Sequence, residues 1–233
     1  MSNLSNKHHQ DSTSFFNVNC GDYTITCGFN PHQCTEAYKL RSETYCNELQ
    51  WVSKCESGQE IDRVDKNAID IGVFKGEELV AYLRCLPPTS LWMINKEFIQ
   101  ISDKKKTTIQ SPNSCEATRL LVKKAYRRHR FENGNTAADA LYQGLFAFCQ
   151  LNHYRFVYMT VSSFVLRTLI NRGLPCTATS NERVMDDGVI TVNGVLDWEN
   201  FIQKQNTDSS QRKMHYLSTL QQATLDSHHQ ISA

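Results

Sequence analysis

Several charged residues of this sequence stand where the hydrophobic pattern predicts β-strands. Asp62 and Asp65 are three residues apart, and Glu116 and Arg119 repeat that spacing near an apolar run. Arg84 stands alone inside another apolar run, residues 81–86. Because a buried charge is costly unless it is paired, these side chains form either a structural ion-pair network or a functional site. Spacing alone favours neither interpretation.

A spacing of three residues has different meanings in different elements. In a turn or helix, Asp62 and Asp65 face one pocket, because residues three apart share a face there. In an extended strand, residues three apart point to opposite faces, so Glu116 and Arg119 lie on opposite faces or are separated by a β-bulge. Bulges occur often beside active sites. Both arrangements remain open at this point.

A basic run follows residue 122 and precedes the strongest helical pattern of the chain. Its cations are Lys123, Lys124, Arg127, Arg128 and Arg130. A strand, a basic loop and a helix N-terminus in this order are typical of a phosphate-binding site, because free N–H groups and the helix dipole attract anions. The alternative is a solvated basic loop, which is the commoner role of a charge run.

The elements that must position these residues alternate between strand and helix. Patterns typical of strands occupy residues 23–29, 70–74, 79–84, 116–122, 154–161, 183–185 and 189–192. Patterns typical of helices occupy residues 31–49, 137–148 and 164–172. This order predicts an α+β fold whose first half is mainly antiparallel.

The composition is that of an ordinary globular chain. The 233 residues include 40% apolar residues and carry a net charge of +1, which predicts a single domain without general affinity for nucleic acid. We expect a disordered leader at residues 1–20, one domain at residues 21–203 and a polar tail at residues 204–233, in which a weak helical pattern occurs. The apolar runs are all shorter than a membrane span.

The cysteines give no sign of a metal site or a disulfide framework. All nine are scattered, and none forms a Cys-x-x-Cys pair. This pattern predicts reduced thiols in a cytoplasmic protein that holds no metal. Cys115 is next to Glu116, but no histidine stands where it would mark this thiol as a nucleophile.

Taken together, the polar and aromatic positions resemble a known family. The series is Arg41-x-x-x-Tyr45, Trp51, Glu60-x-Asp62-x-x-Asp65, Arg84-x-Leu86-Pro87-x-Thr89 and Glu116-x-Thr118-Arg119. Its order and spacing resemble the acyl-homoserine-lactone synthases, the autoinducer synthases of quorum sensing. The resemblance implies the fold of the Gcn5-related N-acyltransferases, an α/β/α sandwich whose mixed, mainly antiparallel sheet is flanked by helices.

The resemblance also implies a reaction. An acyl group passes from acyl carrier protein, or from coenzyme A, to the amine of S-adenosylmethionine, and lactonisation follows. Both molecules are substrates, so no cofactor is implied. Glu116 is then the expected general base, because an attacking amine must lose a proton. Arg119 is expected as the structural partner of Glu116 or as a contact of the acyl donor.

Further residues receive roles from the same resemblance. Those expected to bind the acceptor are Arg41, Tyr45, Trp51, Asp62, Asp65 and Arg84. The first three would form a lid, the two aspartates would hold the positive charge, and Arg84 would contact the carboxylate or pair with the acids. Those expected to line the acyl pocket are Leu145, Phe148, Phe156, Thr160 and Phe164. The basic run would dock acyl carrier protein or hold the pantetheine phosphate.

Two other functions remain open. An N-acyl amino acid synthase of the same fold would acylate a free amino acid. A degenerate acyltransferase fold would act as a binding module without catalysis. The chain also departs from the family pattern, with Tyr45 where the family has phenylalanine and with final residues that have no counterpart in the family.

Overall fold

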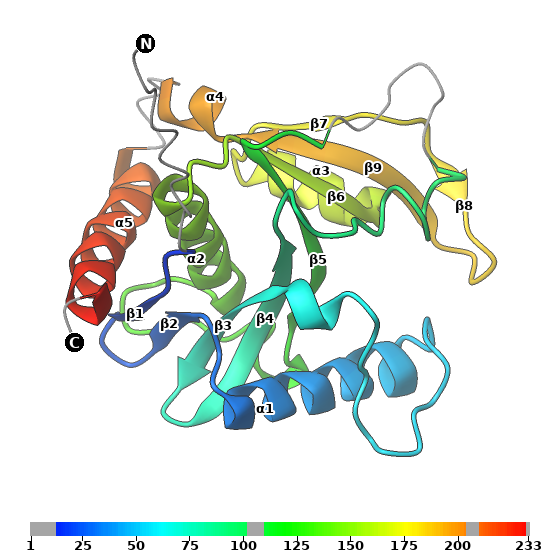
Figure 1. The fold of residues 1–233 in the computed structure, drawn as a ribbon, viewed down its shortest axis with the longest axis horizontal. Helices are drawn as coiled ribbons and strands as arrows, with labels where there is room; N and C mark the ends of the chain where they lie inside the picture. Colours follow the sequence, from blue (N-terminus) through cyan, green and yellow to red (C-terminus); the bar gives the residue numbers. More distant parts are fainter. Residues whose placement is uncertain (1–12, 102–109, 204–209, 232–233) are drawn as a thin grey trace, which may run out of the picture.

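The computed structural model describes residues 13–101, 110–203 and 210–231. In this part of the chain, one sheet has the order β1-β2-β3-β4-β5-β6-β9-β7, and β8 pairs with β9 (Figure 1). The strands are β1 Phe16–Asn19, β2 Thr24–Cys27, β3 Ile69–Lys75, β4 Glu78–Leu86, β5 Ser114–Val122, β6 Phe156–Ser162, β7 Cys176–Ala178, β8 Arg183–Val184 and β9 Ile190–Asp197. The β5–β6 pair is parallel, whereas the other pairs are antiparallel. The predicted mixed, mainly antiparallel fold is confirmed.

Helix α1, Pro31–Arg41, begins with local signals that the sequence contains. The Asn30 side chain accepts from the backbone of Gln33, and the Gln33 side chain accepts from the backbone of Asn30, so two end groups are satisfied. Pro31 follows in the first turn, where its missing N–H costs nothing. The helix continues as a π-helical segment, Ser42–Glu48. Arg41 therefore lies where α1 passes into the π-helical segment.

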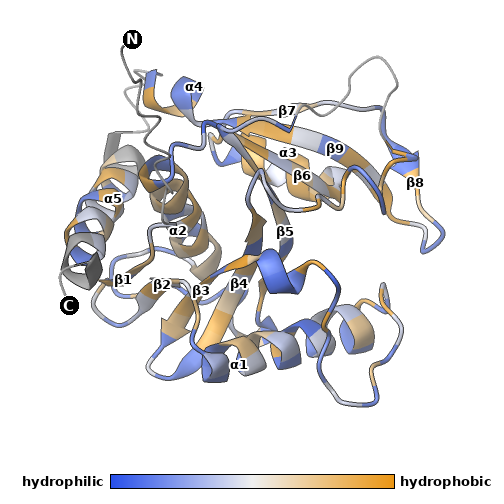
Figure 2. Ribbon diagram, viewed as in Figure 1, coloured by the Kyte–Doolittle hydropathy of each residue, from blue (hydrophilic) through white to orange (hydrophobic). Residues whose placement is uncertain are grey.

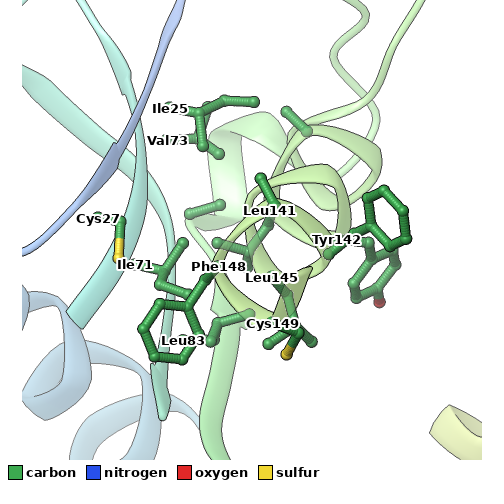
Figure 3. Packing of buried hydrophobic residues seen from close by; sticks show 14 of the residues in the cluster. Ile25, Cys27, Ile71, Val73, Leu83, Leu141, Tyr142, Leu145, Phe148 and Cys149 are labelled. Carbon is green, nitrogen blue, oxygen red and sulfur yellow. The ribbon is translucent and has the colours of Figure 1, made fainter. Parts of the chain in front are cut away.

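Helix α2, Ala137–Leu151, forms the centre of the core. Thr136 and Asp139 form its capping box, and Figure 2 shows hydrophobic residues along most of its length. Its Leu141, Leu145 and Phe148 pack with Ile71 of the sheet (Figure 3). Gly144 lets the helix approach closely, because a Cβ there would lie 2.6 Å from a methyl carbon of Ile25.

The two faces of the sheet have different covers. Leu83 and Cys85 of β4 pack in the core cluster that contains α2, whereas Tyr82 packs with Leu40 of α1. This alternation follows from the two-residue period of a strand. Helix α3, Ser163–Asn171, lies on the α2 side, and the segment that follows β4 packs through Trp92 on the α1 side.

Two irregularities open the middle of the sheet. Pairing between β5 and β6 covers only residues 114–116 of β5, so the two strands separate beyond Glu116. The register between β4 and β5 shifts after Tyr82, and Arg119 has a φ of +54°. This shift is a β-bulge, one of the two arrangements that the spacing of Glu116 and Arg119 left open.

Several predicted boundaries are wrong. Strand β1 lies within residues 1–20, where we expected disorder, and residues 1–12 of that leader are outside the described part. The expected tail contains α5, Ser210–Ile231, which packs on α2 and β1. Tyr216 and Ala223 of α5 are buried, so this helix belongs to the domain. A short helix, α4 Trp198–Gln203, precedes it. Within the described ranges, no helix has the length and apolar character needed to cross a membrane.

Candidate active site

Three arginines and three carboxylates form a closed ring of ion pairs on the α1 side of the sheet. Its members, in order around the ring, are Arg41, Glu60, Arg119, Asp62, Arg84 and Asp65. The arginines come from α1, β4 and β5, and the acids come from the segment between the π-helical turn and β3. Each acid bridges its two neighbouring arginines in the ring, and Arg41 also lies 3.9 Å from Asp62 across it. The ring therefore ties three separate parts of the chain to one another.

The ring is made of short, mostly two-point contacts. Arg41 donates from Nε to Glu60 at 2.5 Å and from its two terminal nitrogens to Asp65 at 2.7 and 3.1 Å. Arg84 donates to both oxygens of Asp62, at 2.8 and 2.9 Å, and to Asp65 at 2.5 Å. Arginine's planar fork suits such paired bonds to carboxylates.

Arg119 closes the ring at its solvent side. It donates to Glu60 at 3.1 and 2.8 Å and to Asp62 at 3.0 Å. The side chains of Arg119 and Asp62 are 14% and 22% exposed, whereas Arg41 and Arg84 are fully buried. Burial acts to raise the pKa of Asp62, but hydrogen bonds and charge from Arg84 and the charge of Arg119 outweigh burial, so the pKa is lowered. The Asp62–Arg119 edge is thus an ionised pair that solvent can reach.

Glu116 lies on the same face of the sheet and has different partners. Its carboxylate accepts hydrogen bonds from the backbone N–H groups of Met93 and Ile94, at 2.6 and 2.9 Å. Its side chain is fully buried, and burial raises its pKa to about 7, although these two hydrogen bonds act to lower it. A carboxyl group with this pKa is partly ionised at neutral pH and suits a general base. Arg119 pairs with Glu60 and Asp62, so the expected pairing of Arg119 with Glu116 is wrong.

Two aromatic residues flank the exposed edge of the ring. The Tyr45 ring lies 5.4 Å from the guanidinium carbon of Arg119, and its hydroxyl donates to the Leu120 carbonyl at 2.9 Å. That hydroxyl is the group by which Tyr45 differs from phenylalanine, and here it fixes the backbone at the β5 bulge. Trp51 lies 6.0 Å from the Tyr45 ring and is 44% exposed. Tyr45 therefore borders the ring of ion pairs, and the exposed Trp51 lies on its outer side.

The other face of the sheet contains an apolar pocket at the same split between β5 and β6. The space between atoms at this pocket is about 420 Å³, a figure that includes open solvent, so the room inside the pocket is much smaller. Its lining residues are Leu83, Ala117, Leu120, Tyr142, Leu145, Met159, Val161, Leu169, Leu174, Leu196 and Trp198. Ala117 and Leu120 lie on β5 beside the residues that build the polar site. An apolar chain and a polar group can therefore meet at this split from opposite sides of the sheet.

Of the five residues expected to line an acyl pocket, one lies in the lining of this apolar pocket. Leu145 lines it, whereas Phe148 is buried against Ile71 (Figure 3) and Phe164 is 74% exposed. Phe156 packs beneath Arg155, 4.7 Å from its guanidinium carbon, and Thr160 donates to the Asn193 side chain at 2.8 Å.

The error on β6 has a simple physical cause. Met159 and Val161 line the pocket, so Phe156 and Thr160, at even positions of the same strand, face the other side of the sheet. A shift of one residue along a strand exchanges its two faces. The prediction placed the correct strand beside the pocket but assigned the wrong face to it.

The basic run lies on the surface after β5, and acidic neighbours neutralise part of it. Lys123 pairs with Glu78 at 2.6 Å, and Arg127 pairs with Glu48 at 2.5 Å. Arg130 donates to the Gly134 carbonyl at 2.8 Å, while Lys124 and Arg128 are exposed. The capping box at Thr136 occupies donors at the start of α2. The surface is less positive than the sequence suggests.

Sequence reasoning missed the backbone of Met93 and Ile94 and the side chain of Tyr142. The first two act through main-chain N–H groups, which no residue type reveals. Tyr142 lies three residues before Leu145 on α2, and the hydrophobic pattern does not distinguish a residue that lines a pocket from one in the core. Trp92, fully buried against Tyr158 at 5.6 Å, anchors the segment that presents the two N–H groups.

Known proteins share both the sequence pattern and the fold. A sequence model of the autoinducer synthase family matches residues 29–205. An acyl-homoserine-lactone synthase of Vibrio anguillarum is 29% identical over 151 residues, which cover 63% of this chain and 76% of that protein. One of Dickeya chrysanthemi is 26% identical over 141 residues, which cover 59% of this chain and 64% of that protein.

Solved structures agree in fold. The acyl-homoserine-lactone synthase LasI has a TM-score of 0.66 at 16% identity, covering 75% of this chain and 89% of that one. The coenzyme-A-dependent synthase BjaI was solved with S-adenosylmethionine and isopentyl-coenzyme A. It has a TM-score of 0.65 at 16% identity, and the match covers 80% of this chain and 83% of that one. Because the family match spans more than half of the chain, the chain belongs to the autoinducer synthase family, and it is an acyltransferase of the acyl-homoserine-lactone synthase type.

Proposed function

We propose that this enzyme transfers an acyl group from acyl carrier protein to the amine of S-adenosylmethionine and then forms the lactone. The observation that supports the proposal is the position of the two sites. The polar ring with Glu116 and the apolar pocket lie on opposite faces of the sheet, at the one place where β5 and β6 separate. An acyl chain in the pocket would present its thioester carbon to an amine on the other side.

The acceptor binds at the exposed Asp62–Arg119 edge in this proposal. Asp62 attracts the amine and the sulfonium, and Arg119 attracts the carboxylate, because both groups are ionised and within reach of solvent. Arg41 and Arg84 are fully buried and bonded to acids, so they hold the edge in place and do not touch the substrate. Tyr45 and Trp51 cover the bound adenosine side.

The reaction then has two steps. The amine nitrogen attacks the thioester carbon, its proton passes through a water molecule to Glu116, and the carrier thiolate leaves. The substrate carboxylate next attacks the carbon attached to the sulfonium, and methylthioadenosine leaves as the ring closes. Neither step needs a covalent enzyme intermediate. The nine free thiols fit the reducing cytoplasm, where we place the enzyme.

The geometry of the site restricts the identity of the acyl donor less than that of the acceptor. Solved relatives include coenzyme-A-dependent synthases, so both thioester types need testing. Incubation with S-adenosylmethionine and either acyl carrier protein thioesters or acyl-coenzyme A thioesters should release methylthioadenosine and free thiol in equal amounts. Faster release from the carrier protein thioester at equal concentration is the expected result. A complete lack of methylthioadenosine with every donor would overturn the proposal.

One observation favours a second candidate, an N-acyl amino acid synthase. The ring contains three arginines and three acids, so it has no surplus negative charge for a sulfonium. A free amino acid needs no such surplus. A panel of amino acids in the same assay separates the two functions, because acylation of an amino acid releases thiol without methylthioadenosine.

A further inference from the structure

The side chain of Met93 meets a fully buried arginine of the ring. A guanidinium has five N–H groups, and in Arg84 each of them needs an acceptor because the side chain is fully buried. Its Nε donates to Thr118, and its two terminal nitrogens donate to Asp62 and Asp65, at distances of 2.5 to 2.9 Å. These bonds account for four N–H groups. The last one, on Nη2, donates to the Met93 sulfur at 3.1 Å.

The backbone of the same residue meets the general base. The Met93 N–H donates to Glu116 at 2.6 Å, and the Met93 carbonyl accepts from the backbone of Lys96 and Phe98 at 3.0 and 3.1 Å. The sulfur also lies 4.0 Å from a terminal nitrogen of Arg119. Met93 therefore contacts the ring through its side chain and holds the carboxylate of the base through its backbone.

Packing alone is the alternative explanation for this methionine. Methionine often fills irregular gaps in a core. The other buried members of its cluster are apolar, namely Val64, Leu86, Trp92 and Ile94. A leucine would keep an apolar side chain of similar size, but it would leave one N–H of a buried cation without an acceptor. The two explanations therefore differ in whether the sulfur or only the volume of the side chain matters.

Building on the proposed function, we propose that Met93 is a positioning residue that couples the ring of ion pairs to the general base. Arg84 holds the sulfur, and this contact fixes the backbone N–H that stabilises ionised Glu116. The ring also presents the Asp62–Arg119 edge, so one side chain helps to position both the site for the acceptor and the base that activates it. Loss of the sulfur should disturb the base through the backbone.

The groups around Glu116 set the direction of the expected effect. The charged and titratable ones are Arg84 of β4, Cys115 of β5, Tyr158 of β6 and Glu97 of the segment after β4. Burial raises the pKa of Glu116 to about 7, whereas the two backbone N–H groups and the charge of Arg84 act to lower it and the charge of Glu97 acts to raise it. Cys115 and Tyr158 are neutral at about pH 7. A weaker bond from Met93 should therefore raise this pKa further.

The test is the pH dependence of kcat/KM in Met93→Leu. The midpoint of the acid limb should rise by about one pH unit, because a hydrogen bond to a charged group shifts its pKa by about that much. At about pH 6, kcat/KM should fall about tenfold relative to wild type, whereas above about pH 8.5 it should stay within about twofold. The acceptor amine titrates identically with both enzymes, so the difference reports the enzyme. A wild-type profile in folded Met93→Leu would overturn the proposal.

Met93→Gln separates positioning from gap filling. Glutamine is similar in length to methionine, and its side-chain oxygen can accept from Arg84. Positioning predicts that this variant keeps a profile closer to wild type than Met93→Leu does. Gap filling predicts the opposite order, because leucine packs well in an apolar cluster and a buried amide does not. That order would refute the coupling.

Leu86→Val is the matched control. Leu86 is fully buried in the same cluster, but its side chain has no polar atom and so holds no arginine. This variant should lose stability, measured by thermal unfolding, and keep the wild-type midpoint. An equal rise of the midpoint in Leu86→Val and Met93→Leu would indicate general loosening of the cluster and would contradict the specific role of Met93.

Failure of the proposed function looks different, because the pKa of Glu116 can be measured without substrate. NMR of protein labelled at the glutamate carboxyl carbon follows the titration, and the Glu116 signal is assigned by its absence in Glu116→Gln. The pKa should be about one unit higher in Met93→Leu than in wild type. A protein that makes no lactone but shows this shift supports the coupling and refutes only the proposed function. Equal pKa values in the two proteins refute the coupling.

Discussion

The two faces of the sheet at the β5–β6 split differ in how well their polar groups are satisfied. On the α1 face, every ring carboxylate bonds to two arginines, and both oxygens of Glu116 accept backbone hydrogen bonds. On the α2 face, an almost wholly apolar pocket contains the buried indole N–H of Trp198, which has no hydrogen-bond partner among the described residues. The first face is complete without a ligand, and the second is not.

This difference indicates how each face contributes to binding and catalysis. A ring that is already paired changes little when substrate arrives, so its role is to hold the Asp62–Arg119 edge and the β5 bulge in a fixed geometry. Buried ion pairs add little net stability, but removing one partner is strongly destabilising. The pocket gains its interactions only when a chain enters. The polar face is thus expected to control rate and folding, and the apolar face to control which donor reacts.

Glu116→Gln tests the polar face most severely. Loss of the general base should lower kcat/KM by about 100- to 10,000-fold. In wild type, kcat/KM should fall about tenfold per pH unit below about pH 7, because protonation of Glu116 removes the base. A pH–rate profile measures this, and thermal unfolding shows whether the variant is folded. A folded variant with wild-type kcat/KM would remove Glu116 from the mechanism.

Arg84→Met breaks the ring without adding bulk. Asp62 and Asp65 would each lose a buried partner, so the free energy of unfolding should fall by about 3–5 kcal/mol. Urea denaturation measures this change. Arg155→Met is the matched control, because Arg155 also pairs with two acids, Asp197 and Glu199, but on the surface. The control should cost far less stability, because exposed ion pairs contribute little, and an equal cost for both would contradict the importance of the ring.

Leu169→Ala enlarges the apolar pocket from its α3 side. We expect a loss of about 2–5 kcal/mol in stability and a shift of the product distribution toward longer acyl chains, measured by mass spectrometry. Leu166→Ala is the control. Leu166 is buried on the same helix, one turn earlier, but does not line the pocket. Its variant should lose stability without the shift, and a similar shift in both variants would point to general loosening.

Arg127→Ala should have the smallest effect. Its ion pair with Glu48 is exposed, so the loss of stability should stay below about 1 kcal/mol. If the basic run docks acyl carrier protein, KM should rise several-fold for the carrier protein thioester and stay constant for the coenzyme A thioester. The rise should shrink at high salt. Arg183→Ala, at an exposed position on β8, is the control, and equal effects of both variants would exclude a specific docking role for Arg127.

The sequence was sufficient for the fold and for the members of the ring. Periodicity located most strands and the three main helices, and the resemblance brought together residues that lie far apart along the chain. The sequence did not reveal which side chains pair with which, because Glu116 and Arg119 are close in sequence but bond to different segments. Their separation depends on the β5 bulge, and its position follows from tertiary packing.

Other errors come from information that one sequence does not contain. The face of β6 that meets the pocket depends on a shift of one residue, and Phe156 and Met159 are both hydrophobic. Strand β1 is short and lies next to polar residues, so its pattern is weak, yet Phe16 and Val18 are buried once β2 pairs with it. Helix α5 is polar in composition and buries only a narrow stripe around Tyr216 and Ala223.

Helix α5 also has a consequence for the order of events during synthesis. Its Asp226 accepts a hydrogen bond from the backbone of Asn17 in β1 at 2.7 Å, across 209 residues, and its Tyr216 packs 5.6 Å from Phe146 and 6.3 Å from Trp198. The edge strand and the pocket wall therefore acquire these neighbours only after residues 210–231 have left the ribosome. At about 5–20 residues per second, the pocket wall therefore stays incomplete for some seconds after β9, the last strand, has been synthesised. A nascent chain should hold the ring of ion pairs before it holds a finished pocket.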